Sequence, residues 1–354
     1  MKKFLTVFLV PLVLTSVLLA QNTKDNIKFS GLMFGDFFYN VSAFDSSQKN
    51  INGFQFRRIY ITTDYTISEN FNTRFRLDAD PTAGTLTTGG KFGVAVKDAW
   101  LQCKNIFEGS NLVFGISPTP AYDVSEAAWG HRDLEKTIMD LFGIVSSRDF
   151  GVDLKGKFNE SGKVKYWLKI ANNSGNSPET NKYKRFYGLV EFDPSPELLI
   201  TIYGDYAMAP QKLDPFDNTK KDNSAIVGAA FLNYRQKGSY SIGIEGFLKS
   251  QMNNYASAAN TALSTQTGYG ISVWAFGNLS DKVQLVGRFD TYDPNTNSNS
   301  NKDGKSMILG GIQYNPINHV SVTPNVEVMT YQASSPNHGD KSDVVPRITL
   351  FWEF

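Results

Sequence analysis

The chain has 354 residues, of which 35 are lysine or arginine and 34 are aspartate or glutamate, so its formal net charge at pH 7 is +1. A balance this close to neutral gives no electrostatic reason to expect a nucleic-acid partner. Cys103 is the only cysteine in the sequence, which excludes an internal disulfide. We expect Cys103 to be a small buried or lipid-facing residue on the apolar side of a strand.

The first twenty residues predict a secretory signal peptide. Lys2 and Lys3 precede an apolar run at 4–19, and Ala20 stands before a polar segment. We place the cleavage after Ala20, so that residues 21–354 form one mature domain, and no cysteine follows the run as a lipoprotein would need. Beyond residue 20 there is no stretch of 18 apolar residues to form a transmembrane helix. A membrane-spanning mature chain must therefore be a closed β-barrel.

Alternation of apolar and polar residues is the main signal in the mature chain. The clearest case is 71–80, where apolar residues on one face alternate with polar and charged residues on the other. One such strand fits a soluble β-sandwich as well as a membrane barrel, but repetition favours the barrel. We predict sixteen strands, at 27–43, 54–67, 71–80, 92–105, 111–117, 148–158, 164–171, 183–192, 198–208, 225–235, 239–249, 268–277, 282–292, 306–314, 319–331 and 343–354.

The predicted connections alternate between short and long. Every second one is a tight turn rich in turn-forming residues, such as 68–70, 108–110 and 193–196. Long loops on one rim and short turns on the other are the plan of bacterial outer-membrane barrels. We therefore expect an all-β, 16-stranded antiparallel transmembrane barrel that contacts outer-membrane lipid and has both termini at the short-turn side. The long polar loops are predicted at 44–53, 81–91, 118–147, 172–182, 209–224, 250–267, 293–305 and 332–342.

The last predicted strand ends at the terminal Phe354, with Ile348, Leu350 and Trp352 on the same face. A C-terminal strand that ends in phenylalanine resembles the assembly signal of bacterial outer-membrane barrels. That resemblance implies that the barrel assembly machinery recognises Phe354. The aromatic residues near predicted strand ends that suit interfacial girdles are Phe29, Tyr65, Phe71, Tyr166 and Trp352.

The connection at 117–147 is the longest, and a loop of this length inside a compact domain is usually functional. Its apolar residues at helical spacing predict short helices with one side packed on the inner wall. We expect this third long loop to fold into the lumen as a constriction, because a barrel of this size otherwise leaves an open aqueous channel. The expectation rests on the helix starts Asp123 with Glu126 and Asp133 with Lys136, the helix end Gly143, and the apolar residues Trp129, Leu134, Ile138 and Leu141.

Inward-facing basic residues cluster on the strands that flank this loop. Arg58, Arg74 and Arg76 precede the loop, and Lys155 and Lys157 follow it. One interpretation is an electropositive wall opposite an acidic loop, which would focus the electric field across the pore. The other interpretation is a ladder of cross-strand ion pairs that neutralise each other.

The register of one predicted hairpin separates these interpretations in part. If Glu69 centres the turn, the facing residues are Arg74 with Asp64, Arg58 with Asp80, and Arg76 with Thr62. Arg76 then has no direct acidic partner, which makes it the best candidate for a base that meets solutes.

The loop region adds charges of both signs. Between 117 and 149 there are six acidic residues against three basic ones, which predicts a transverse dipole with only mild ion selectivity. His131 could act as a pH-sensitive gate, but a solvated loop residue is the favoured interpretation. The candidate pore-lining residues of this region are Glu126, His131, Arg132, Asp133, Lys136 and Arg148.

No cofactor or metal ion is expected, because the three histidines lie far apart in the sequence without ligand spacing. An enzyme would need a nucleophile beside a base. The histidine nearest to a serine, His319 before Ser321, stands at a short turn. We therefore expect a passive diffusion channel for small hydrophilic solutes or ions rather than an enzyme. The alternative is a non-conducting structural or adhesin barrel.

Three stretches resemble the phosphate-selective porin O and P family. They are GFQFRRIYITTDYTISENFNTRFRLDAD from Gly53, WGHRDLEKTIMD from Trp129 and SRDFGVDLKG from Ser147. The resemblance covers most of the mature chain. It implies a trimeric, 16-stranded porin of the bacterial outer membrane whose third extracellular loop is the constriction, and a channel for phosphate or other anions.

Overall fold

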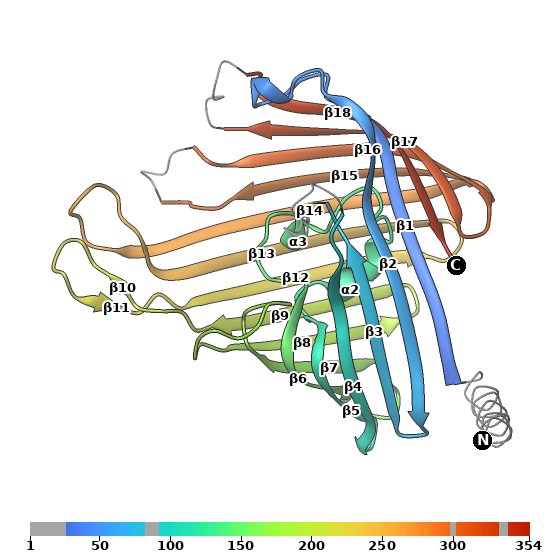
Figure 1. Cartoon of the computed structure of the whole chain (residues 1–354), viewed down its shortest axis with the longest axis horizontal. Coiled ribbons are helices and arrows are strands. Elements are labelled where there is room, and N and C mark those ends of the chain that lie inside the picture. The colour runs from blue at the N-terminus through green and yellow to red at the C-terminus, as the bar shows by residue number, and fades with distance from the viewer. Residues whose placement is uncertain (1–25, 82–91, 298–301, 333–338) are drawn as a thin grey trace, which may run out of the picture.

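The computed structural model describes residues 26–81, 92–297, 302–332 and 339–354, and these form a closed antiparallel β-barrel (Figure 1). Sixteen strands of this described part follow one another around the barrel in chain order, and β1 (Ile27–Tyr39) pairs with β18 (Ser342–Glu353) to close it. Reciprocal backbone hydrogen bonds of 2.9 Å join Gly31 to Phe354 at this seam. The predicted barrel is confirmed, whereas the predicted signal peptide at 1–20 lies outside the described residues.

The strands agree with the predicted ones, with boundaries that shift by a few residues. The other barrel strands are β2 (Asn52–Ser68), β3 (Phe71–Ala79), β4 (Ala95–Phe107), β5 (Ser110–Pro118), β6 (Arg148–Lys157), β7 (Val164–Ala171), β8 (Arg185–Ser195), β9 (Leu198–Ala207), β12 (Ala225–Gln236), β13 (Tyr240–Tyr255), β14 (Ser264–Ser280), β15 (Val283–Asp293), β16 (Lys305–Ile317) and β17 (Val320–Tyr331). The smaller elements are the 3-10 helix η2 (Ser46–Gln48), the helices α2 (Asp123–Trp129) and α3 (Ile138–Leu141), and a separate hairpin of β10 (Lys212–Leu213) and β11 (Lys220–Lys221).

Strand β9 illustrates how the barrel wall separates two environments. Thr201, Tyr203 and Asp205 are no more than 6% exposed and point inward, whereas Ile202 between them is 59% exposed on the outer surface. The same period of two recurs around the wall and leaves a belt of exposed isoleucine, leucine, valine and phenylalanine outside. Such a belt is stable against the hydrocarbon of a membrane, so the barrel spans one.

The sixth long loop is shorter than the sequence predicts. We expect it at 250–267, but pairing of β13 with β14 continues until only 256–263 remain between them. The register shifts between Gln251 and Tyr255, where Asn253 has a φ of 48°. The two strands extend past the apolar belt because backbone pairing continues in water without any need for apolar alternation.

The segment between β5 and β6 contains α2 and α3, as expected, but the predicted helical turn from Asp133 to Lys136 is wrong. Gly130, with a φ of 67°, ends α2, and residues 131–137 form turns and extended backbone. The carbonyl groups of Asp133, Leu134 and Glu135 accept hydrogen bonds from the side chains of Arg57 and Trp129. In the described part of the chain, no helix is long and apolar enough to cross a membrane.

Candidate functional site

The segment 119–147, called the loop below, is anchored to the barrel wall by apolar contacts. Trp129, Leu134, Ile138 and Met139 in this loop are all 0% exposed. Burial of each such side chain contributes about 1.5–3 kcal/mol. The side chains of the wall that pack with the loop are Trp167, Tyr187, Tyr203 and Phe247 in one cluster, and Phe231, Trp274, Met307 and Leu309 in the other.

Arg57 attaches the opposite side of the loop to β1 and β2. Its guanidinium donates a 2.8 Å hydrogen bond to the carbonyl of Leu134 and another to the carbonyl of Asp133. The same group forms a 2.7 Å ion pair with Asp36 and lies over the ring of Phe34. The loop therefore contacts the barrel wall on two sides, by apolar packing and by this arginine.

The sequence analysis missed Arg57 because simple alternation assigns neighbouring residues to opposite faces. A bulge shifts the register between β1 and β2, so that Phe34 faces Arg58 while Gly35 faces Phe56. Arg57 is the extra residue, and both arginines thus point inward. The sequence did contain a signal, because strict alternation would place one of two adjacent arginines on the lipid face. That placement costs about 2–4 kcal/mol near the midplane, so the pair indicates a bulge.

His131 is not the solvated loop residue that the sequence favours. It is 5% exposed, and its ring packs edge-on against Trp129 and Phe276. Burial lowers the pKa of His131 to about 4, so the ring is uncharged at neutral pH. Burial also raises the pKa of the neighbouring Asp133 to about 6.

The predicted cross-strand ion pairs are present. Arg74 forms a 2.6 Å ion pair with Asp64, and Arg58 pairs with Asp80. Both follow from the register of β2 and β3, which places Ile59 opposite Ala79.

The prediction that Arg76 lacks an acidic partner is wrong. Arg76 donates a 2.8 Å hydrogen bond to Thr62 on β2, as expected, and also forms a 3.2 Å ion pair with Asp98 on β4. Strand β3 has a neighbour on each side, and the sequence reasoning considered only one. Asp98 also pairs with Arg148 at 2.5 Å. Arg76, which the sequence predicts as a free base in contact with solutes, is thus neutralised by Asp98.

A polar cavity of about 540 Å³ lies between the loop and the wall. Phe34, Tyr60 and Trp100 supply aromatic surface on the side of β1, β2 and β4. A second cavity of about 400 Å³ adjoins β5 to β8, and Asp123 and Lys155 line both. The charged residues that line the larger of the two are Arg74, Arg76, Asp123, Glu126, Arg132, Asp133, Arg148 and Lys155.

The remaining candidates from the sequence lie elsewhere. Arg58 and His131 are buried beside the cavity but do not line it. The backbone carbonyl of Lys136 accepts a 2.5 Å hydrogen bond from Arg288 on the wall. Lys157 is exposed at the end of β6 and borders only the smaller cavity. No group of residues that could hold a metal ion occurs in the described ranges.

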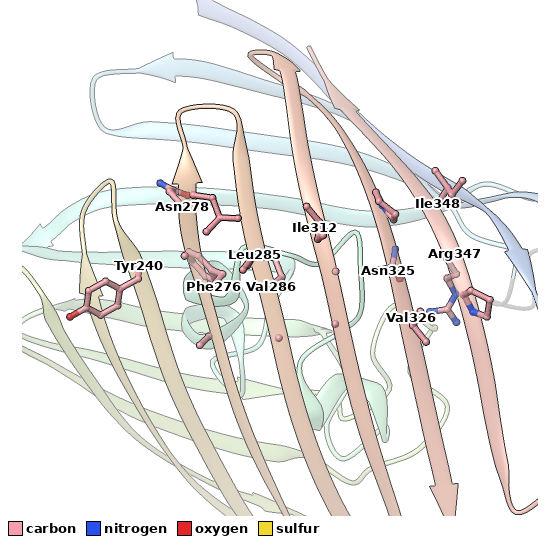
Figure 2. Close-up of a pocket in the computed structure, with 18 of the residues that line it drawn as sticks. Tyr240, Phe276, Asn278, Leu285, Val286, Ile312, Asn325, Val326, Arg347 and Ile348 are labelled. Carbon is pink, nitrogen blue, oxygen red and sulfur yellow. The ribbon is translucent and has the colours of Figure 1, made fainter.

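A larger hollow of about 1290 Å³ lies on the outer surface over β13 to β18 (Figure 2). Gly287 faces Gly310 in adjacent strands, so the wall is thin there, and Leu285, Ile312 and Ile348 rise around it with 43–50% exposure. These side chains belong to the lipid-facing belt. Hydrocarbon fills such a hollow in a membrane, so the polar cavities inside the barrel are the candidate solute site.

Solved structures of several bacterial outer-membrane proteins share this fold. An anion-selective porin from Comamonas acidovorans has a TM-score of 0.64 at 11% sequence identity, with 93% of this chain and 99% of that chain covered. OprB from Pseudomonas putida has a TM-score of 0.65 at 10% identity, covering 93% and 94% of the two chains. The outer membrane protein OmpT from Vibrio cholerae, in its trimer form, has a TM-score of 0.58 at 13% identity, covering 93% and 99%.

These likenesses define the class of fold, a 16-stranded barrel of the outer-membrane porin type. No protein-family model matches the chain, and the comparison with curated proteins found no match. The resemblance to the phosphate-selective porin O and P family therefore gains no support beyond the porin fold.

Proposed function

We propose that this protein is a porin of the bacterial outer membrane that lets small hydrophilic solutes or ions diffuse through its barrel. The observation that carries the proposal is the polar, charge-lined cavity inside a barrel whose outer surface is apolar. A wall with hydrocarbon outside and hydrated charges inside separates membrane from water. Diffusion along that interior needs no cofactor and no catalytic group.

In this proposal the loop at 119–147 lies in the lumen and narrows it. The support is its contact with inward-facing side chains on one side and with Arg57 on the other. The described strands alone would enclose a wide channel, because barrels of sixteen strands are not filled by their own side chains.

The same proposal covers export and assembly. Residues 1–20 would serve as a signal peptide, and the mature chain from residue 21 would insert from the periplasm. The assembly machinery would recognise the last strand through Phe354, which pairs with Gly31 at the barrel seam. A homotrimer surrounded by outer-membrane lipid would follow the OmpT neighbour, which is described as a trimer.

Selectivity for phosphate or other anions is the narrower function that the family resemblance implies. In the cavity Arg74 and Arg76 are paired with carboxylates, as is Arg148, and Arg132 lies 3.3 Å from Glu126. Paired bases attract anions less than free ones, so we expect a weak ion preference.

Single-channel conductance in planar bilayers tests the proposed function. The wild-type protein should produce discrete conductance steps. Deletion of residues 123–143 should enlarge these steps while the barrel still folds, because the deletion removes no strand pairing. Absence of steps in both proteins would refute the channel and favour a non-conducting structural or adhesin barrel. Equal step sizes would place the loop outside the conducting path.

A further inference from the structure

Most charges that line the larger cavity are neutralised by a partner of opposite sign. Arg76 and Arg148 share Asp98, and Arg132 lies between Glu126 and Asp140 at 3.3 and 3.5 Å. Arg74 is paired with Asp64 outside this group. These bases carry little free charge toward a solute.

Asp123 and Lys155 differ from these residues. Neither has an oppositely charged side chain within 4 Å among the residues that the structure describes. The Lys155 ammonium instead lies 4.3 Å from the centre of the Trp167 ring. Asp133 also lines the larger cavity without an ion pair, but it is only 7% exposed and does not border the smaller cavity.

The two unpaired residues come from opposite sides of the space. Asp123 is the first residue of α2 in the loop, and Lys155 stands on β6 of the wall. Both border the larger and the smaller cavity, so they lie where the two cavities adjoin. Asp123 lies within electrostatic reach of Arg148 first and of Lys155 second, and forms a direct ion pair with neither. An anionic and a cationic group thus border the same space, one from the loop and one from the wall, without a direct ion pair.

The Lys155 side of this space is held firmly. Trp167 is 7% exposed, and its indole N–H donates a 2.7 Å hydrogen bond to Asp153. Asp153 also accepts from Lys169 at 3.1 Å. The aromatic ring therefore provides a fixed support for the Lys155 side chain, which keeps the ammonium group beside the two cavities.

We propose that Asp123 and Lys155 form a binding site for small zwitterions, in which the solute carboxylate binds Lys155 and its ammonium group binds Asp123. This inference rests on the proposed channel function and names the solute class that the channel favours. A zwitterion satisfies both unpaired charges and brings no net charge into the lumen. A simple anion or cation satisfies one of them and is repelled by the other.

Osmotic swelling of proteoliposomes measures this preference. Alanine is the zwitterionic probe, and lactamide, which has nearly the same size and no charge, is the neutral probe. The wild-type protein should admit alanine faster than lactamide after subtraction of the rates in protein-free vesicles. Asp123→Asn and Lys155→Met should each lower the alanine-to-lactamide ratio by about two- to fivefold, as expected for one water-exposed ion pair.

Matched controls and an exchange of the two charges complete the test. Glu160→Gln and Lys163→Met remove the same charges at an exposed turn and should leave the ratio unchanged. The double variant Asp123→Lys with Lys155→Asp should keep the preference for alanine, because the solute can bind in reverse. An unchanged ratio in both single variants, or loss of the preference in the double variant, would overturn the inference. No swelling with either solute in the wild type would instead refute the proposed channel.

Discussion

Replacement of Trp129 by alanine should release half of the loop without disturbing the barrel. Trp129 is 0% exposed, packs against Trp274, and donates a 2.9 Å hydrogen bond from its indole N–H to the carbonyl of Glu135. Truncation of a buried tryptophan costs about 3–5 kcal/mol. This cost changes the balance between packed and released loop by roughly two to nearly four orders of magnitude.

The released part should be limited to the residues around α2, because Ile138 and Met139 remain buried in the other apolar cluster. Single-channel recordings of Trp129→Ala should therefore show larger mean conductance and stronger current noise than the wild type. Phe289→Ala removes an aromatic ring on the lipid-facing side, at 46% exposure, and serves as the control. Conductance and noise equal to the wild type in a folded Trp129→Ala barrel would refute the view that this contact holds the loop.

Three further predictions concern the lipid face, pH and topology. Ile202→Arg should destabilise the barrel by about 2–4 kcal/mol if it lies near the midplane, and wild-type levels of heat-resistant barrel in the membrane would contradict the assigned face. The pKa of His131 is lowered to about 4 from its ordinary 6.5, so its contribution to loop packing is full above pH 6.5 and is lost as the pH falls toward 4. Current noise should thus rise more on acidification in the wild type than in His131→Gln. Burial raises the pKa of Asp133 to about 6, so protonation of Asp133 on acidification stabilises the packed loop and cannot produce this rise in noise. A cysteine at Asn176 in a long loop should react with an impermeant label on intact cells and one at Ser161 in a short turn should not, and the reverse result would invert the topology.

The order of the strands and the position of the loop follow from features that are local in the sequence. Alternation in 71–80 and in the later strands, together with alternating short and long connections, predicts the sixteen strands that close the barrel. The hairpin register around Glu69 also predicts the pairing of Arg74 with Asp64. These features are readable because a strand between lipid and water must repeat every two residues, and a tight turn sets the register of its two strands.

Only the tertiary structure decides which charged side chains of the lumen lack an ion-pair partner. Arg76 loses its role as a free base because Asp98 comes from the next strand, and Arg57 points inward because of a bulge opposite β1. Asp123 and Lys155 stand out only once the cavities between the loop and the wall are known. Ion pairing depends on distances of a few ångströms between residues that are far apart in the chain, and a periodic pattern in the sequence carries no information about those distances.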